Sequence, residues 1–477
     1  MQRALLLSLV TASYLLFAGG PRWTLAPLLG LALLGLVVAP RATLKFSDAT
    51  RSLDIAALAI AASILLQLVP MPAAGVSWLS PQAQVLRART RFTIADGATA
   101  SWLPLSIDAE ATGFALATFA LGFLSFLIAR AVFSTGGTRQ FCRRLGFLAA
   151  IAAVVAIVQK ALMPGVLMGL IVPEARNANP LGAFLNRNHF AGWLLMCATI
   201  STGYLTAHFH IHPAYRDRLR GAFKHFLTSG ALLSGLGVLI AIGALLMTLS
   251  RSAAAGLGAA ALTAGWLGRH RIRIERTNLP ALSILAGVSI LLLAAFVDFN
   301  GWLTRLQGSA GGAGEPLGRL TIWRESLPMI RDFALTGTGA GTFGTAMAHY
   351  QQSRVWVGSM QQWAYFNNAH SHYVQLAVEG GLLLGGPVAA ALVLLARLGI
   401  AAVRADKGEM FWMRAGAAAG LIGMAVQSVW EVAMIMPANA VLAGVLAGLL
   451  LHRRDPSARS PERFAPPWTP PVAGRRA

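Results

Sequence analysis

Long apolar runs separated by short polar segments occupy most of the chain. The runs are roughly 16–25 residues long, which is the length of helix that crosses the hydrocarbon core of a bilayer. The pattern predicts twelve transmembrane helices, at approximately 4–20, 23–39, 53–72, 111–133, 145–163, 189–207, 227–249, 252–267, 279–298, 371–397, 412–431 and 438–452. The predicted fold class is therefore an all-α polytopic membrane protein with about 12 transmembrane helices.

Composition agrees with this fold class. Of the 477 residues, 56% are hydrophobic and 12% are charged, and the mean hydropathy is +0.61. A soluble domain carries roughly twice that charged fraction. The formal charge of +21 would suggest nucleic acid in a soluble protein, but cytoplasmic loops of membrane proteins collect Lys and Arg. Since no nucleic-acid motif is present either, we expect a lipid bilayer and no nucleic acid among the partners.

The basic residues also predict the orientation in the membrane. One alternate set of short segments is basic, and the positive-inside rule puts these segments and both termini in the cytoplasm. We interpret the first apolar run, at about 4–20, as a retained transmembrane helix and not as a cleaved signal peptide. The opposite set must face outward, at about 73–110, 164–188, a tight turn near Arg251, 299–370 and a turn near Pro437. We therefore predict one membrane domain over 1–452, with a large periplasmic loop at about 299–370. The basic, Pro-rich segment 453–477 is predicted to be a disordered cytoplasmic tail.

Arginines on the outward side are informative because the positive-inside rule disfavours them there. They include Arg187 at the start of one span, Arg251 between two spans, and Arg319 and Arg324 in the large loop. The planar guanidinium fits phosphate oxygens, and a helix start presents free N–H groups, so these positions predict an anionic ligand at the membrane edge. The alternative is that the polar residues cap helices and the arginines snorkel to lipid headgroups. Arg251 has almost no loop around it, which favours a functional role.

Two histidines in "AHSHYVQLAVEGG" form a second candidate site. His370 and His372 could bind a metal with Glu379, or they could cap the next helix. One of them could instead act as a general base, since the unperturbed imidazole pKa suits proton transfer at neutral pH. The two cysteines, Cys142 and Cys197, show no disulfide or metal-type spacing, and we expect neither a metal nor a cofactor.

Four segments in order resemble one known family, the O-antigen ligase and polysaccharide polymerase superfamily of bacterial inner membranes. They are "FLNRNHFAGW", "LSRSAAAG", "GRLTIWRESLPMIRDFALTGTGAGTF" and "NNAHSHYVQLAVEGGLLLGG", which together cover about 184–386. The resemblance implies about twelve spans and one large periplasmic loop, similar to the GT-C type of glycosyltransferase. It also implies metal-independent transfer of a glycan from undecaprenyl diphosphate to an acceptor hydroxyl.

The resemblance further implies roles for single residues. His370 matches the family's catalytic histidine, and Arg187, Arg251 and Arg319 match the motifs that hold the donor diphosphate. Secondary candidates flank these positions, namely Asn188, His189, Arg324 and His372. Many members read His-Asn-(Asp)-Tyr where this chain has His370-Ser371-His372-Tyr373. Because of the second histidine, the choice between the two imidazoles as base stays open.

The acceptor also stays open at this point. A ligase would use lipid A-core, a polymerase would use another lipid-linked glycan of an O-antigen or exopolysaccharide, and a protein oligosaccharyltransferase would use Ser or Thr. The competing function is a multi-span transporter or flippase of lipid-linked saccharides. Such proteins place ionisable groups at mid-membrane and show repeat symmetry, whereas the outward cations here cluster at one face and no such repeat is evident.

Overall fold

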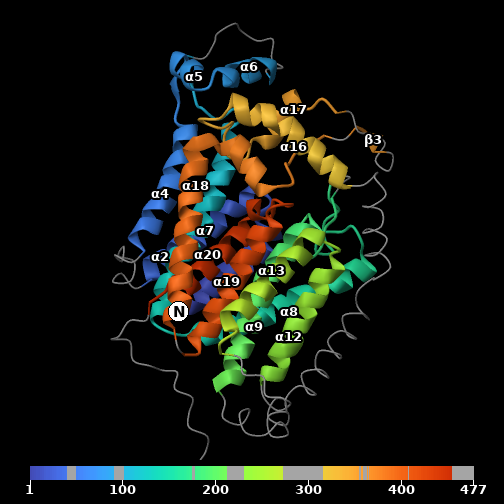
Figure 1. Ribbon diagram of the computed structural model, residues 1–477. Coiled ribbons are helices and arrows are strands. Elements are labelled where there is room, and N and C mark those ends of the chain that lie inside the picture. Colours follow the sequence, from blue (N-terminus) through green and yellow to red (C-terminus); the bar gives the residue numbers. More distant parts are fainter. Residues whose placement is uncertain are drawn as a thin grey trace, which may run out of the picture.

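A computed structural model describes residues 1–39, 50–90, 101–174, 178–211, 230–271, 315–353, 356–357, 362–363, 365–406 and 408–453. Over these residues the protein is mostly helical, as predicted. A bundle of long helices carries a smaller lobe at one end (Figure 1).

The bundle is built from helices that coincide with the predicted spans. They are α1 (Gln2–Leu15), α2 (Leu25–Val38), α4 (Arg51–Leu68), α7 (Ala109–Ser134), α8 (Thr138–Leu162), α9 (Arg187–Ile211), α12 (Gly230–Met247), α13 (Arg251–Gly268), α18 (His372–Ala405), α19 (Met410–Gln427) and α20 (Pro437–Leu451). Short 3-10 turns lie at η1 (Phe17–Gly19), η2 (Arg22–Thr24) and η5 (Ala433–Ile435). Predicted span 279–298 lies outside the described residues.

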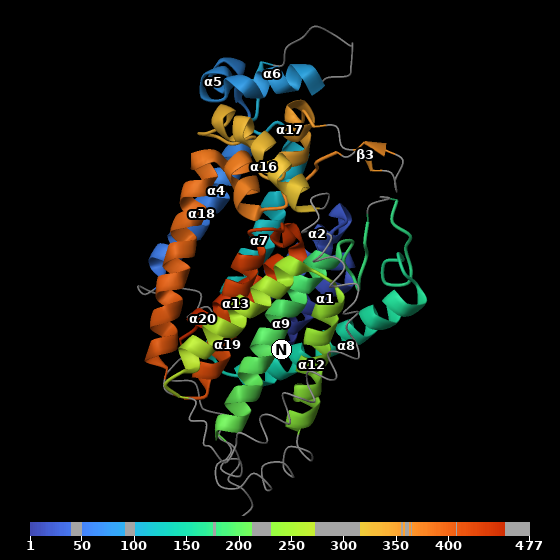
Figure 2. The ribbon, with the colours of Figure 1, turned by 45° about the vertical axis from the view of Figure 1, so that its right-hand side comes forward.

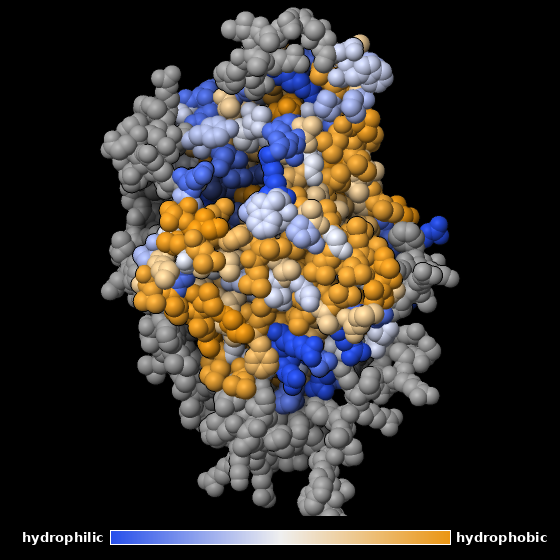
Figure 3. Space-filling view, turned by 180° about the vertical axis from the view of Figure 1, so that it is seen from behind, coloured by the Kyte–Doolittle hydropathy of each residue, from blue (hydrophilic) through white to orange (hydrophobic). Residues whose placement is uncertain are grey.

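Within the described part of the chain, five helices are long and apolar enough to cross a membrane. They are Arg51–Leu68, Ala109–Ser134, Thr138–Leu162, Arg187–His208 and His372–Ala405. Shorter apolar helices accompany them, and apolar side chains cover much of the middle of the bundle surface, with hydrophilic residues above and below (Figure 3). The protein is thus a helical, multi-pass membrane protein, while the number of twelve spans stays a prediction.

Two predicted helix boundaries were wrong. The basic stretch Arg139–Arg144, predicted as loop, lies in the first turns of α8, which begins after Gly137 with φ +83°. Arg side chains are long enough to keep their charge at the interface while the backbone is helical. At the other boundary, α19 ends at Gln427, whereas the predicted span continued to residue 431. The second difference matters because Glu431 lies in the connection that follows α19 and not within the helix.

The lobe joins two segments that the sequence presents as separate outer loops. One contributes α5 (Ala73–Leu79), α6 (Pro81–Thr90) and the antiparallel pair of β1 (Met71–Pro72) with β2 (Trp102–Leu103), paired Met71 to Leu103. The other contributes α16 (Glu315–Asp332), α17 (Phe343–Tyr350) and the hairpin of β3 (Trp356–Val357) with β4 (Gln362–Trp363), paired Trp356 to Trp363. They share one apolar core, which includes Val76, Leu86, Met329, Phe343 and Phe366.

A buried carboxylate fastens the lobe to the bundle. Glu379, in the second turn of α18, accepts hydrogen bonds from the backbone N–H groups of Gly341 (2.8 Å) and Phe343 (3.1 Å). The turn-rich segment before them approaches α18 so closely that a Cβ on Gly337 (φ +66°) would lie 2.1 Å from the Glu379 carbonyl oxygen. Only glycine tolerates both that conformation and that contact, so this segment is rigidly seated on α18.

The bundle carries basic residues at the end away from the lobe. There Arg139 pairs with Glu409 at 3.1 Å, and Arg414 pairs with Asp406 at 3.4 Å. Arg3 donates to the Thr135 carbonyl oxygen, also at this end. Figure 2 shows the lobe and this basic end at opposite ends of the bundle. These arginines belong to the basic segments from which the membrane orientation is predicted.

Candidate functional site

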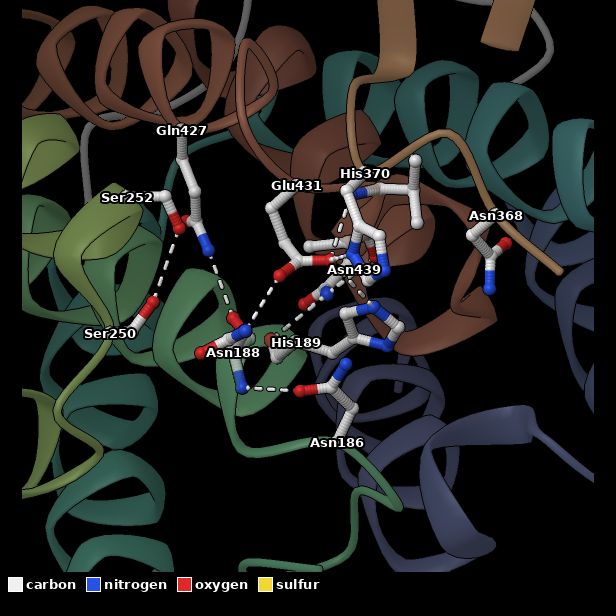
Figure 4. A network of polar contacts seen from close by, with 12 residues as sticks. Asn186, Asn188, His189, Ser250, Ser252, Asn368, His370, Gln427, Glu431 and Asn439 are labelled. Carbon is white, nitrogen blue, oxygen red and sulfur yellow. Dashed lines mark hydrogen bonds and ion pairs between the residues drawn. The ribbon is translucent and has the colours of Figure 1, made fainter. Parts of the chain in front are cut away.

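A second buried carboxylate, Glu431, is the centre of a polar cluster that also contains Asn188, His189 and His370 (Figure 4). It lies in the connection between α19 and α20, and its side chain is 0% exposed. Its Oε2 accepts a hydrogen bond from Asn188 Nδ2 at 2.7 Å. Its Oε1 accepts from the Val432 N–H at 3.1 Å and lies 3.5 Å from His189 Nε2 and 4.0 Å from His370 Nδ1. Residues distant in sequence thus converge on one carboxylate.

The first turn of α9 is built around this carboxylate. Asn186 caps the helix, because its Oδ1 accepts the Asn188 N–H at 2.8 Å. From the neighbouring helices, Gln427 Nε2 donates to the Asn188 carbonyl at 2.9 Å and Asn439 Nδ2 donates to the His189 carbonyl at 3.1 Å. The polar run at the start of this apolar span therefore has a local purpose: it supplies a cap and the partners of a buried acid.

His370 lies between the lobe and α18 and is held from both sides. The preceding carbonyl, of Ala369, accepts from Trp323 Nε1 of α16 at 2.9 Å. On the other side, the His372 N–H donates to the Ser428 carbonyl at 2.8 Å. His370 itself has φ +48°, a conformation that is uncommon outside glycine and clusters at functional sites. The backbone thus fixes the position from which this ring projects.

Exposure separates the three histidines. The His370 side chain is 38% exposed although its Nδ1 is buried and faces Glu431, whereas the His189 side chain is 8% exposed. His372 begins α18, and its Nδ1 is also buried. Of the two histidines that face Glu431, His370 is the one whose ring can also meet a substrate.

The electrostatics keep Glu431 charged. Burial acts to raise the pKa of Glu431, but the hydrogen bond and charge of His189, the charge of His370 and the Val432 N–H outweigh it and lower the pKa to about 2. A buried carboxylate that stays ionised needs such partners. The cluster is therefore a buried anion faced by two imidazoles.

Two of the predicted arginines begin helices at this end of the bundle. Arg187 is the first residue of α9, and Arg251 is the first residue of α13, whose N-cap is Ser250. The two helices run side by side against α19, since a Cβ on Gly256 would touch the Gly423 carbonyl and the Leu195 side chain. Both arginines are half-buried. As predicted, α12 and α13 are joined by a tight reversal at Arg251.

The predicted loop arginines lie on α16. Arg319 is half-buried and precedes Trp323 by four residues, so both lie on the helix face that contacts the residue before His370. Arg324 is exposed and lies about 100° around the helix from Trp323. Arg319 thus shares a face of α16 with Trp323, and Arg324 lies on the lobe surface.

Glu431, Gln427 and Asn439 are the members of the cluster that the sequence pattern did not reveal. Glu431 was assigned to the end of a predicted span, and Gln427 and Asn439 were included in predicted apolar spans. An acid at the end of a membrane span is costly and marks function or pairing, so Glu431 carried a signal. No comparable argument distinguishes Gln427 and Asn439 in the sequence.

The fold and the cluster define a helical membrane protein with a polar site at one end of its bundle. Residues 236–386 match the family model described as O-Antigen ligase. The match confirms the resemblance to the O-antigen ligase superfamily and indicates a membrane protein with a role in glycan transfer. The matched segment includes Arg251, Arg319 and His370, while Arg187 and Glu431 lie outside it. No curated protein matches the chain.

Proposed function

We propose that the protein transfers a glycan from undecaprenyl diphosphate to an acceptor hydroxyl, in the bacterial inner membrane and with its site facing the periplasm. The observation that carries the proposal is the position of His370. It lies within the family-matched segment, presents a partly exposed ring, and turns Nδ1 toward a buried carboxylate. These features support a role for His370 as an imidazole general base with an acidic partner.

In the proposed reaction, His370 Nε2 takes the proton of the acceptor hydroxyl while its oxygen attacks the anomeric carbon of the donor glycan. The bond from that carbon to the diphosphate breaks, and undecaprenyl diphosphate leaves with the electron pair. Arg187, Arg251 and Arg319 hold the developing negative charge, which preorganised guanidinium groups in a dry site stabilise strongly. Attack from the face opposite the leaving group inverts the anomeric centre.

The arrangement of charges supports the proposed orientation. The lobe lies at one end of the bundle (Figure 2), and the first turns of α8 and α19, which carry Arg139 and Arg414, lie at the other. A cysteine at Ser77 in the lobe should react with an impermeant maleimide in cells with a permeabilised outer membrane. A cysteine at Gly408, exposed at the basic end, should not. The reverse pattern would remove the site from the periplasm.

The decisive experiment is turnover in proteoliposomes. Purified protein is given an undecaprenyl-diphosphate glycan together with a lipid A-core acceptor, a second lipid-linked glycan or a Ser/Thr peptide, and the glycosylated product is measured by mass spectrometry. The acceptor that is consumed distinguishes ligase, polymerase and protein oligosaccharyltransferase. Movement of the labelled donor across the bilayer without any new glycosidic bond would overturn the proposal in favour of a flippase.

A further inference from the structure

The Glu431 carboxylate has more partners than a structural role requires. Of the charged or titratable side chains among the described residues, His189 and His370 are found within 4.0 Å of Oε1. The Asn188 side chain and the Val432 N–H already supply ordinary hydrogen bonds to its two oxygens. The imidazoles are therefore additional partners, and they arrive from two elements that are far apart in sequence.

The two imidazoles that face Glu431 differ in exposure, and this difference indicates a chemical role. His189 is 8% exposed, and its backbone carbonyl is bound by Asn439, so it is enclosed between α9 and α20. His370 is 38% exposed and belongs to the segment that connects lobe and bundle. Glu431 thus contacts a fixed imidazole on one side and an accessible imidazole on the other.

We propose that Glu431 is the positioning residue of His370: its carboxylate holds the Nδ1–H of the ring, so that the unprotonated Nε2 faces the acceptor hydroxyl. The partner of one ring nitrogen decides which nitrogen carries the proton, and an acidic partner also stabilises the imidazolium formed after proton transfer. The Nδ1–Oε1 separation is 4.0 Å, which is longer than a hydrogen bond, and catalytic hydrogen bonds that are long without substrate often shorten when substrate binds. His189 and Asn188 hold the carboxylate in place from the opposite side.

This inference rests on the proposed function for its kinetic test. α19 offers a matched pair of glutamates, since Glu409 precedes its first turn and Glu431 follows its last. In proteoliposomes, Glu431→Gln should lower kcat by roughly ten- to a thousandfold, as expected for losing the acid that orients a histidine. KM for donor and acceptor should change less than about twofold, because neither substrate contacts the buried carboxylate. Glu409→Gln should leave both parameters unchanged.

The pH dependence supplies a readout that a purely structural role would not move. Loss of the negative charge favours the neutral imidazole, so the acidic limb of the kcat profile should shift to lower pH in Glu431→Gln. Carbethoxylation of His370 by diethyl pyrocarbonate, quantified by peptide mass spectrometry, should show the same shift whether or not the enzyme turns over. Asn188→Ala provides a second variant that loosens the carboxylate without removing it, and a smaller fall in kcat is expected.

The outcomes distinguish the inference from the proposed function. If wild-type protein transfers no glycan but the carbethoxylation midpoint shifts in Glu431→Gln, the proposed function falls and the positioning role stands. If transfer occurs and folded Glu431→Gln matches Glu409→Gln in kcat and in midpoint, the positioning role falls and the function stands. If Glu431→Gln does not fold, an unchanged kcat in Asn188→Ala overturns the inference.

Discussion

Two buried glutamates at the same end of the bundle have opposite surroundings. Glu379 accepts hydrogen bonds from two backbone N–H groups, of Gly341 and Phe343, and from the Gln375 side chain at 2.9 Å. Glu431 faces two imidazoles and one amide side chain. The donors to Glu379 do not change protonation, and the two backbone N–H groups among them are held in place by the fold. The set around Glu431 includes two imidazole side chains, a type of group that can bind and release a proton.

The difference indicates that Glu379 holds the lobe on the bundle, whereas Glu431 takes part in the proposed chemistry. A carboxylate bound by backbone N–H groups holds a loop in one place, because those donors move only if the fold changes. A carboxylate beside imidazoles can respond when one ring binds a proton. The sequence motif that contains His370 also contains Glu379 and suggests that the two act together, whereas the structure gives His370 a different acid. Each experiment below tests this division of roles.

The largest effect is expected at His370. His370→Ala should lower transfer by about a hundred- to ten-thousandfold, the size of general-base catalysis, and should leave donor binding nearly intact because the arginines remain. The matched variant His372→Ala should lower activity by much less. Product formation and binding of the labelled donor are measured in proteoliposomes. If His372→Ala is the inactive variant, the base was assigned to the wrong histidine.

A smaller effect is expected at Arg251. Arg251→Lys keeps the charge but removes the planar fork, and each lost charge-assisted hydrogen bond to diphosphate costs about 1.5–3 kcal/mol. Transfer should therefore fall roughly ten- to a hundredfold. Arg331→Lys, at an exposed position of α16, is the control and should have normal activity. Normal turnover of Arg251→Lys at normal abundance would show that Arg251 contacts lipid headgroups only.

Glu379→Gln should change stability rather than chemistry. The amide that replaces one oxygen would point a donor at the N–H of Gly341 or Phe343, and a buried unsatisfied donor costs about 1–3 kcal/mol. We expect a lower thermal unfolding midpoint in detergent, with kcat per folded molecule close to wild type. Glu409→Gln serves again as the control. A fall in kcat without loss of stability would place Glu379 in the chemistry and remove the distinction between the two acids.

No effect is expected from chelation. Both oxygens of Glu379 are engaged by N–H groups of the lobe segment, and the proposed reaction uses a base and arginines without a Lewis acid. Transfer rates should be equal in excess EDTA and in magnesium. A loss of activity that one particular divalent ion restores would support metal binding by His370, His372 and Glu379 instead.

The helices were predictable because their apolar length is a direct physical signal. Every predicted span within the described residues coincides with a helix, although Arg139 and its neighbours moved from loop into helix. The union of two outer segments into one lobe was not predictable. It depends on contacts such as Val76 with the core around Phe343, and each segment alone shows no complementary pattern.

The site was predictable only in part, for a similar reason. Local motifs predicted His370, Arg187 and Arg251, and the structure has each at or just before the start of a helix, while their roles stay predictions. Glu431 is 61 positions beyond His370, and the two come together only because α19 returns to the end where α18 begins. Asn188 and His189 were secondary candidates for the site, with helix capping as the alternative. In the structure both contact the buried acid.

The two-part lobe has a consequence for how the protein is made. The hydrogen bond from the Ala340 N–H to Gln67 Oε1 joins positions 273 residues apart. At about 5–20 residues per second, the ribosome needs roughly 14–55 s to deliver the second partner after the first. During that interval, apolar side chains of the first segment, Val76 and Leu86 among them, lack the partners that cover them in the finished protein. Biogenesis therefore includes an interval in which this apolar surface is uncovered, and the cluster around Glu431 forms only after residue 431 has been made.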